Sequence, residues 1–191
     1  MKNIQFIKES LKNIKEVGTV FPSSKFIVEK MVAPINFEKK LIILELGPGS
    51  GVITKKLLEK MNYDSQLICF ETNKKFYQEL KKINDKKMVL INKSAEKMKL
   101  HLDEFEIEKV DYIVSSVPLV SLPKETTNKI LSISVEILGE SGKLIQLQYT
   151  KLLDKRLKSH YNQIDIQFTL KYYLPAFIYT CHNQASIKEV F

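Results

Sequence analysis

The chain has 191 residues, of which 44% are hydrophobic and 27% charged. This length and composition predict one globular domain that buries about 70% of its unfolded surface. No apolar stretch reaches the ~18 residues of a spanning helix, and no signal-peptide pattern is present, so we expect a cytoplasmic protein. The two cysteines, Cys69 and Cys181, lie in apolar runs and are expected to be reduced core thiols. The three histidines have no metal-site spacing.

The net charge of +8 favours an anionic partner, either nucleic acid or an acidic membrane surface. A generally lysine-rich composition explains the charge equally well. Arg156 is the only arginine of the chain. Because arginine is favoured for bidentate contacts with phosphates and bases, its scarcity argues against sequence-specific binding of nucleic acid.

Residues 2–17 predict an amphipathic helix that ends at Gly18. Its apolar residues recur at steps of three and four: Ile4, Ile7, Leu11, Ile14 and Val17. Such a basic helix can lie in a membrane interface, or it can pack on its own domain and cover a cofactor. A second helix is expected over about residues 24–33. Residues 1–33 would thus be a helical appendage to a single domain that spans residues 1–191.

Residues 41–46 are apolar except for Glu45, which is typical of a strand buried on both faces. Gly47, Gly49 and Gly51 follow, alternating with Pro48 and Ser50, and a helical pattern begins at residue 52. A strand, a glycine turn and a helix place a ligand at the end of the strand. Glycine would allow that ligand to approach the backbone closely.

A second apolar run, residues 67–70, ends in Glu71. In a strand–helix–strand unit, a carboxylate at this position can bind both hydroxyls of a ribose. The glycine spacing is G-x-G-x-G and differs from the G-x-G-x-x-G of dinucleotide binders. A tight turn without a ligand is the alternative interpretation.

The rest of the chain alternates strands and helices. We expect strands over residues 88–91, 110–115 and 143–147, and helices over 74–82, 124–138 and 148–160, with a loop or short helix at 101–108. Residues 164–173 and 177–181 predict a closing hairpin. This order indicates an open, mostly parallel α/β sheet.

The glycine motif, together with Glu45 before it and Glu71 after it, resembles the first motif of class I S-adenosylmethionine-dependent methyltransferases. The resemblance implies a Rossmann-like fold with a mostly parallel seven-stranded sheet, an antiparallel last strand and helices on both faces. It implies S-adenosyl-L-methionine as cofactor and S-adenosyl-L-homocysteine as product. The cofactor-binding residues would be Glu45, Gly47, Pro48, Gly49, Ser50, Gly51, Glu71, Thr72, Ser94, Ala95, Glu96 and Ser115. For Glu96, a carboxylate that favours a helix start is the alternative.

The segment Ser115-Ser-Val-Pro-Leu119 follows the strand where substrate amines meet the methyl group. Methyltransferases that act on adenine carry Asn/Asp-Pro-Pro-aromatic here, and the aromatic ring stacks on the base. In this chain Ser116 replaces the Asn and Leu119 replaces the aromatic residue, a loss of roughly 1–3 kcal/mol for a base. The framework thus resembles the rRNA adenine dimethyltransferases, whereas the base-reading residues differ.

A closer resemblance is to the bacterial phospholipid N-methyltransferases. It rests on the N-terminal amphipathic helix, Gly18-Thr-Val-Phe-Pro-Ser-Ser24, the glycine motif, Ser94-Ala-Glu96, Ser115-Ser-Val-Pro-Leu119 and Gln146-Leu-Gln-Tyr149. That family usually has Gly-Leu-Pro after the fourth strand, from which Ser116-Val-Pro118 departs.

The resemblance implies methylation of the amine of phosphatidylethanolamine and its methylated intermediates, at the inner face of the membrane. Tyr149 is the first candidate to touch the amine, and Ser115 and Ser116 are the next. A tyrosine that only packs a loop is the alternative for Tyr149. An RNA or small-molecule methyltransferase and a non-catalytic S-adenosylmethionine-binding protein are the alternative functions.

Overall fold

The computed structural model describes residues 22–171 and 174–183. The expected helix over residues 2–17 lies outside them. The seven strands are β1 (Ile42–Leu46), β2 (Gln66–Phe70), β3 (Met88–Ile91), β4 (Val110–Ser115), β5 (Leu138–Gln148), β6 (Gln163–Lys171) and β7 (Leu174–His182). The α-helices are α2 (Pro22–Val32), α3 (Val52–Lys60), α4 (Lys74–Leu80), α5 (Met98–Glu104), α6 (Lys124–Ile137) and α7 (Asp154–Lys158). Short 3₁₀ helices are η1 (Ala95–Lys97), η2 (Leu119–Ser121) and η3 (Lys151–Leu153).

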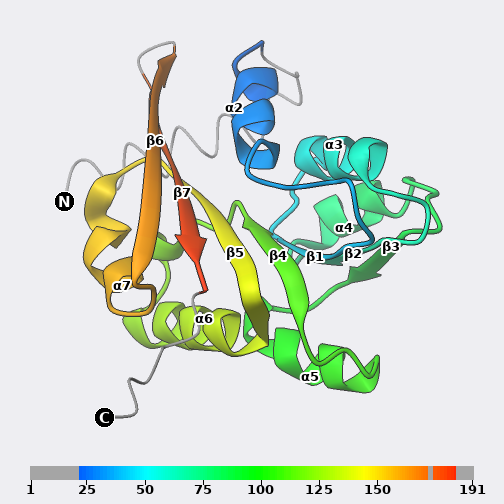
Figure 1. Cartoon of the computed structure of the whole chain (residues 1–191). Coiled ribbons are helices and arrows are strands. Elements are labelled where there is room, and N and C mark those ends of the chain that lie inside the picture. Colours follow the sequence, from blue (N-terminus) through cyan, green and yellow to red (C-terminus); the bar gives the residue numbers. More distant parts are fainter. Residues whose placement is uncertain (1–21, 172–173, 184–191) are drawn as a thin grey trace.

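The strands form one sheet in the order β3-β2-β1-β4-β5-β7-β6 (Figure 1). The first five of these run parallel to one another. β7 inserts between β5 and β6 and runs antiparallel to both. The predicted mostly parallel seven-stranded sheet with an antiparallel last strand is therefore confirmed.

Helices cover both faces of the sheet, and each face has its own buried core. On one face, α2 and α3 contribute Met31 and Leu57, which pack with Ile43 of β1. On the other face, α5, α6 and α7 pack on residues that include Leu44 and Ile113. The central strands β1 and β4 bury both faces because both sides are covered, which explains their nearly continuous apolar sequences.

The predicted helix over residues 148–160 is wrong in its first half. Gln148 is still part of β5, where it pairs with Phe177 of β7. The chain then turns at Thr150, whose side chain accepts a hydrogen bond from the Leu152 N–H and caps η3. β5 also begins at Leu138, five residues earlier than expected, because Leu138 adopts an extended backbone at the end of α6. A pattern of polar residues could not reveal these pairings with distant strands.

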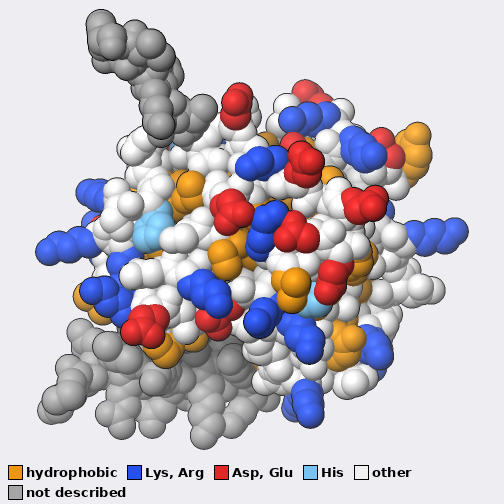
Figure 2. Space-filling model, turned by 90° about the horizontal axis from the view of Figure 1, so that it is seen from below, with side chains coloured by type: hydrophobic (Ala, Val, Ile, Leu, Met, Phe, Trp, Pro, Cys, Tyr) orange, Lys and Arg blue, Asp and Glu red, His pale blue; other side chains and the backbone are white. Residues whose placement is uncertain are grey.

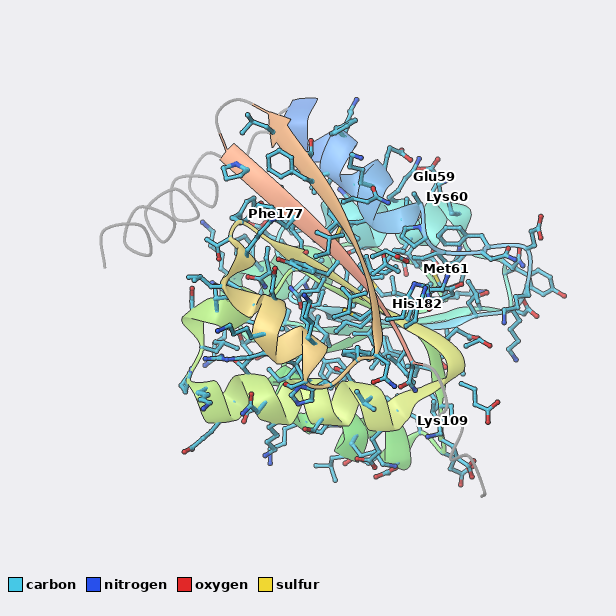
Figure 3. The ribbon with its side chains drawn as sticks, turned by 60° about the vertical axis from the view of Figure 1, so that its left-hand side comes forward. Glu59, Lys60, Met61, Lys109, Phe177 and His182 are labelled. Atoms are coloured by element: carbon cyan, nitrogen blue, oxygen red, sulfur yellow. The ribbon has the colours of Figure 1, made fainter. Side chains whose placement is uncertain are left out.

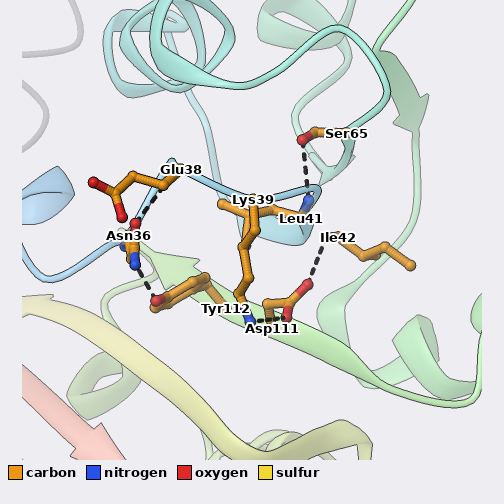
Figure 4. A network of polar contacts seen from close by, with 8 residues as sticks. All are labelled: Asn36, Glu38, Lys39, Leu41, Ile42, Ser65, Asp111 and Tyr112. Carbon is orange, nitrogen blue, oxygen red and sulfur yellow. Dashed lines mark hydrogen bonds and ion pairs between the residues drawn. The ribbon is translucent and has the colours of Figure 1, made fainter.

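Polar contacts fix the amino ends of the central strands (Figure 4). The Ile42 N–H donates to Asp111 Oδ2 over 2.8 Å, and the Leu41 N–H donates to Ser65 Oγ over 3.0 Å. The Asn36 N–H donates to the Tyr112 hydroxyl over 3.2 Å. These bonds tie the connection between α2 and β1 to β2 and β4, and they leave the carboxyl ends of the strands for a ligand site.

Figure 2 shows the molecule from below, the side on which α5 and α6 lie in Figure 1. Acidic and basic side chains are interspersed on this face, so it offers no single-sign surface among the residues described. Within the same described ranges, no helix is long and apolar enough to cross a membrane.

Candidate cofactor and substrate site

The glycine turn joins β1 to α3. Gly47, Gly49 and Gly51 have φ angles of 69°, 58° and 79°, a left-handed conformation that favours glycine. The Gly51 N–H donates to the Pro48 carbonyl over 3.0 Å and closes the turn. Ser50 is exposed at its tip.

Only one of these glycines faces open space. A Cβ atom added to Gly49 would have no neighbour within 4 Å, so the backbone is accessible there. A Cβ on Gly51 would lie 2.9 Å from Leu80 Cδ2 and 3.2 Å from Ile83 Cδ1. The sequence interpretation explained all three glycines in the same way, by the close approach of a ligand to the backbone. That reason fits Gly49, whereas Gly51 is required by packing against the residues of α4 and the turn after it.

Glu71 lies at the end of β2, beside the glycine turn, and is 6% exposed. Its Oε2 accepts the Gly49 N–H over 3.0 Å, and its Oε1 accepts the Asn73 N–H over 2.7 Å. The carboxylate is thereby fixed, and each oxygen keeps a lone pair for another donor. An open backbone beside a fixed carboxylate fits the ribose and amino acid portions of S-adenosylmethionine.

Two asparagines that the sequence interpretation missed support Glu71. The Asn73 side chain caps α4 by accepting the N–H groups of Lys75 and Phe76. The Asn92 side-chain amide donates to the Glu71 carbonyl over 2.6 Å. Asn73 had a sequence signal, since an asparagine directly before a helical pattern is a common cap. Thr72, between Glu71 and Asn73, is exposed.

The loop after β3 forms η1. The Ser94 hydroxyl donates to Glu96 Oε2 over 3.2 Å and accepts the Glu96 N–H over 3.3 Å. Ala95 is 8% exposed and packs in the core. The hydroxyl of Ser94 is thus engaged within its own turn, and a cofactor contact from these residues stays a prediction.

Glu45 is placed differently from the other predicted cofactor residues. It is 1% exposed within β1, and the Cys69 thiol donates to its Oε2 over 3.5 Å. Burial raises the pKa of Glu45 to about 7, although Thr54 and Cys69 partly oppose this shift. An enclosed carboxylate cannot touch a cofactor directly, so this placement favours a supporting role inside the sheet.

The raised pKa of Glu45 makes the stability of the protein pH-dependent. Between the ordinary pKa of 4.5 and about 7, the unfolded chain releases this proton while the folded chain keeps it. Stability therefore falls by about 1.4 kcal/mol per pH unit over this window and is level above it. We expect the free energy of unfolding of the wild type, measured with urea, to fall by roughly 2 to 3 kcal/mol between pH 5 and pH 8. In Glu45→Gln this fall should be absent. Glu79→Gln, on exposed α4, is the control and should retain the wild-type pH dependence.

The loop after β4 lies directly against the glycine turn. The Ser116 N–H donates to the Leu46 carbonyl over 3.0 Å, which continues the pairing of β4 with β1. A Cβ on Gly47 would lie 3.0 Å from Val117 Cγ2. The structure thus brings together the glycine turn, Glu71 and the predicted substrate loop, and Ser116 is partly exposed there.

Ser115 is too deeply buried to contact a substrate. It is 0% exposed, and its hydroxyl accepts the Val117 N–H over 3.4 Å. A role in shaping the loop fits this residue better than contact with the reacting amine or the cofactor.

Two glutamines of β5 hold the same loop and had no assigned role in the sequence interpretation. The side-chain amides of Gln146 and Gln148 donate to the Val117 carbonyl over 3.0 and 3.1 Å. They are 0% and 2% exposed. Two polar residues at alternate positions in an apolar strand were the available signal, because buried amides need partners.

Tyr149 follows these glutamines at the end of β5 and lies on the opposite face of the strand. It is half-buried and packs against the core under α2 and α3. Burial raises the pKa of Tyr149, so the hydroxyl is protonated at neutral pH. It can donate a hydrogen bond, or the ring can face a cation, but it does not act as a base.

The sequence profile of the ribosomal RNA adenine dimethylase family matches residues 10–165. The chain belongs to this family. It is therefore an S-adenosylmethionine-dependent methyltransferase, and the predicted cofactor and enzyme class are confirmed.

One relative aligns with nearly the whole chain, and its name differs from that of the family. The ornithine lipid N-methyltransferase of Singulisphaera acidiphila is 24% identical over 189 residues, which cover 97% of each chain. The methyltransferase described here thus matches a family named for RNA and a distant relative named for a lipid.

Solved structures agree on the fold. The N-methyltransferase NodS of Bradyrhizobium japonicum, in complex with S-adenosyl-L-homocysteine, has a TM-score of 0.68 at 11% identity, over 86% of this chain and 89% of that one. The CurJ carbon methyltransferase has a TM-score of 0.65 at 15% identity and covers 92% of this chain, which spans 58% of that longer chain. An rRNA methylase of Streptococcus thermophilus has a TM-score of 0.59 at 14% identity, over 83% and 95% of the two chains.

Proposed function

We propose that this methyltransferase methylates the amine of a membrane lipid at the membrane surface. The observation that carries the proposal is the position of Leu119. It takes the place where adenine methyltransferases present a stacking aromatic ring, and it is 1% exposed. Its carbonyl is also held by the Thr127 hydroxyl over 2.7 Å. A buried leucine cannot stack on a base, so a primary amine on a flexible head group is a better acceptor for this loop.

Each part of the site has a role in this proposal. Glu71 and the open backbone at Gly49 bind S-adenosylmethionine, which supplies an electrophilic methyl group. Gln146 and Gln148 fix the loop so that Ser116 faces the acceptor amine. Tyr149 approaches from the other face of β5 and orients the amine, or faces the methylated product as a cation–π partner.

The amine must reach the site in its neutral form. The raised pKa of Tyr149 keeps its hydroxyl protonated, and the hydroxyl of Ser115 is enclosed. Bulk water therefore takes the proton that the amine releases. On this reasoning, transfer should become faster as pH rises toward the pKa of the lipid amine.

Phosphatidylethanolamine and an ornithine lipid share the chemistry that this site would recognise, which is a primary amine on a lipid head group. The resemblance of the motifs favours the first, and the name of the curated relative favours the second.

RNA is the second candidate acceptor. The family match and the net charge of +8 favour it. The replacement of the base-stacking residue by buried Leu119 weighs against it.

The experiment is transfer of a labelled methyl group from S-adenosylmethionine to three acceptors in parallel: phosphatidylethanolamine vesicles, ornithine-lipid vesicles and total RNA. We expect label in a lipid phase, and chromatography would give the number of methyl groups added. Label in RNA alone would refute the proposal and make the family name the better guide.

A further inference from the structure

We propose that one face of the β6–β7 hairpin docks on an anionic lipid bilayer and holds the lipid beside the methyl-transfer site. The choice of partner rests on the proposed function. The surface, called the hairpin face below, consists of the exposed side chains of Leu152, Ile166, Phe168 and Leu170 and of Phe177, which is only 9% exposed.

The hairpin face is unusually apolar for an exposed surface. Ile166, Phe168 and Leu170 occupy alternate positions of β6 and are 42%, 56% and 63% exposed. Leu152 of η3 is 65% exposed. Large exposed apolar patches on a protein mark sites of interaction with other proteins, membranes or ligands.

Because side chains alternate between the two faces of a strand, Ile166, Phe168 and Leu170 lie on the same face of β6. Gln167 accepts a hydrogen bond from Lys30 of α2 over 3.3 Å, so it faces α2. Its neighbours Ile166 and Phe168 therefore face the side of α7. There the Phe168 and Phe177 rings lie 5.2 Å apart, and with Ile166 and Lys151 they line an open groove.

Basic side chains lie on the side of the hairpin face that is next to η3 and α7. Lys151 Nζ lies 5.5 Å from the centre of the Phe177 ring. Lys155 and Lys158 are exposed on α7. Of the nearby acids, Asp154 accepts a hydrogen bond from the Tyr179 hydroxyl, and Asp165 lies 2.8 Å from His182 Nε2. An apolar surface edged by lysines is complementary to acyl chains under anionic head groups.

The hairpin face adjoins the substrate loop. Phe177 pairs with Gln148, whose side chain holds the Val117 carbonyl, and η3 contacts η2 directly after the loop. Figure 3 shows Phe177 and His182 well apart along β7, with His182 at its last residue. Phe177 marks the end where β5 finishes, which is the edge that carries the glycine turn and Tyr149.

The positive charge of the protein favours an anionic bilayer over a second copy of the chain as the partner of the hairpin face. A second copy of the chain carries the same charge of +8, so two lysine-edged surfaces would repel each other. An anionic bilayer supplies both the apolar interior and the negative charge that this surface lacks.

The absence of tryptophan from the sequence gives a site-specific test. Phe168→Trp places a single fluorophore on the hairpin face of the full-length protein. Tyr63→Trp is the matched control, because Tyr63 is 93% exposed in the connection between α3 and β2. Each variant is mixed with vesicles of phosphatidylglycerol and brominated phosphatidylcholine, since bromine quenches tryptophan only on contact within the bilayer.

We expect quenching and a blue shift at position 168 and neither at position 63. We further expect Phe168→Asp with Leu170→Asp to weaken vesicle binding about tenfold or more, because an apolar contact is replaced by charge. Leu100→Asp, at a position on α5 that is 52% exposed, should bind as the wild type does.

Vesicle binding without quenching at position 168 would overturn the proposal and locate membrane contact elsewhere. A blue shift that needs no vesicles but grows with protein concentration would overturn it in favour of a second copy. Quenching at position 168 without methylation of any lipid would keep the docking surface and refute the proposed function. Lipid methylation without quenching would keep the function and refute the docking surface.

Discussion

Glu71→Gln is expected to raise the dissociation constant for S-adenosyl-L-homocysteine about a hundredfold. The carboxylate is fixed by the Gly49 and Asn73 N–H groups and would accept the ribose hydroxyls. The neutral glutamine side chain would place its own N–H group against one of these donors. The hydrogen bonds that remain would no longer be made to a charged group. Hydrogen bonds to charged groups contribute roughly 1.5–3 kcal/mol each, so losing about 3 kcal/mol corresponds to this factor.

Isothermal titration calorimetry with S-adenosyl-L-homocysteine measures the effect directly. Glu79→Gln makes the same chemical change on the exposed surface of α4 and should leave the affinity unchanged. A change of less than about threefold for a folded Glu71→Gln protein would remove Glu71 from the ribose site.

Valine at Gly49 and at Gly51 should produce different defects, although only Ser50 separates the two sites. Both substitutions force a left-handed backbone, at a cost of about 1–2 kcal/mol. At Gly49 the new side chain enters open space where the cofactor would lie, so we expect binding to be abolished in a folded protein. At Gly51 it meets Leu80 and Ile83, and overpacking adds about 1–3 kcal/mol of destabilisation.

Urea unfolding and cofactor titration on both variants separate the two effects. Gly139→Val is a control for the added volume, since Gly139 has no left-handed φ and its Cβ would lie 3.9 Å from the nearest atom, the Val110 carbonyl oxygen. If Gly49→Val bound S-adenosyl-L-homocysteine normally, the glycine turn would not be the cofactor site.

Local sequence patterns predicted most of the fold. The apolar run before Gly47, the helical pattern after Gly51 and the short strand at residues 88–91 contain their own periodicity, so their bounds agree with the structure within a residue. The glycine motif with Glu71 indicated the cofactor before any contact was known. These features depend on backbone conformation and on residues close in the chain.

The tertiary structure decided which residues can reach a ligand. Glu45 and Ser115 belong to plausible motifs, but strand packing encloses both, whereas Gly49 is open. Gln146 and Gln148 acquire their role only because β4 and β5 are neighbours. The apolar cluster on the hairpin face depends equally on the pairing of β6 with β7. Sequence periodicity assigns a residue to a face of its own element, but only the packing of distant elements determines whether that face is covered, paired or exposed.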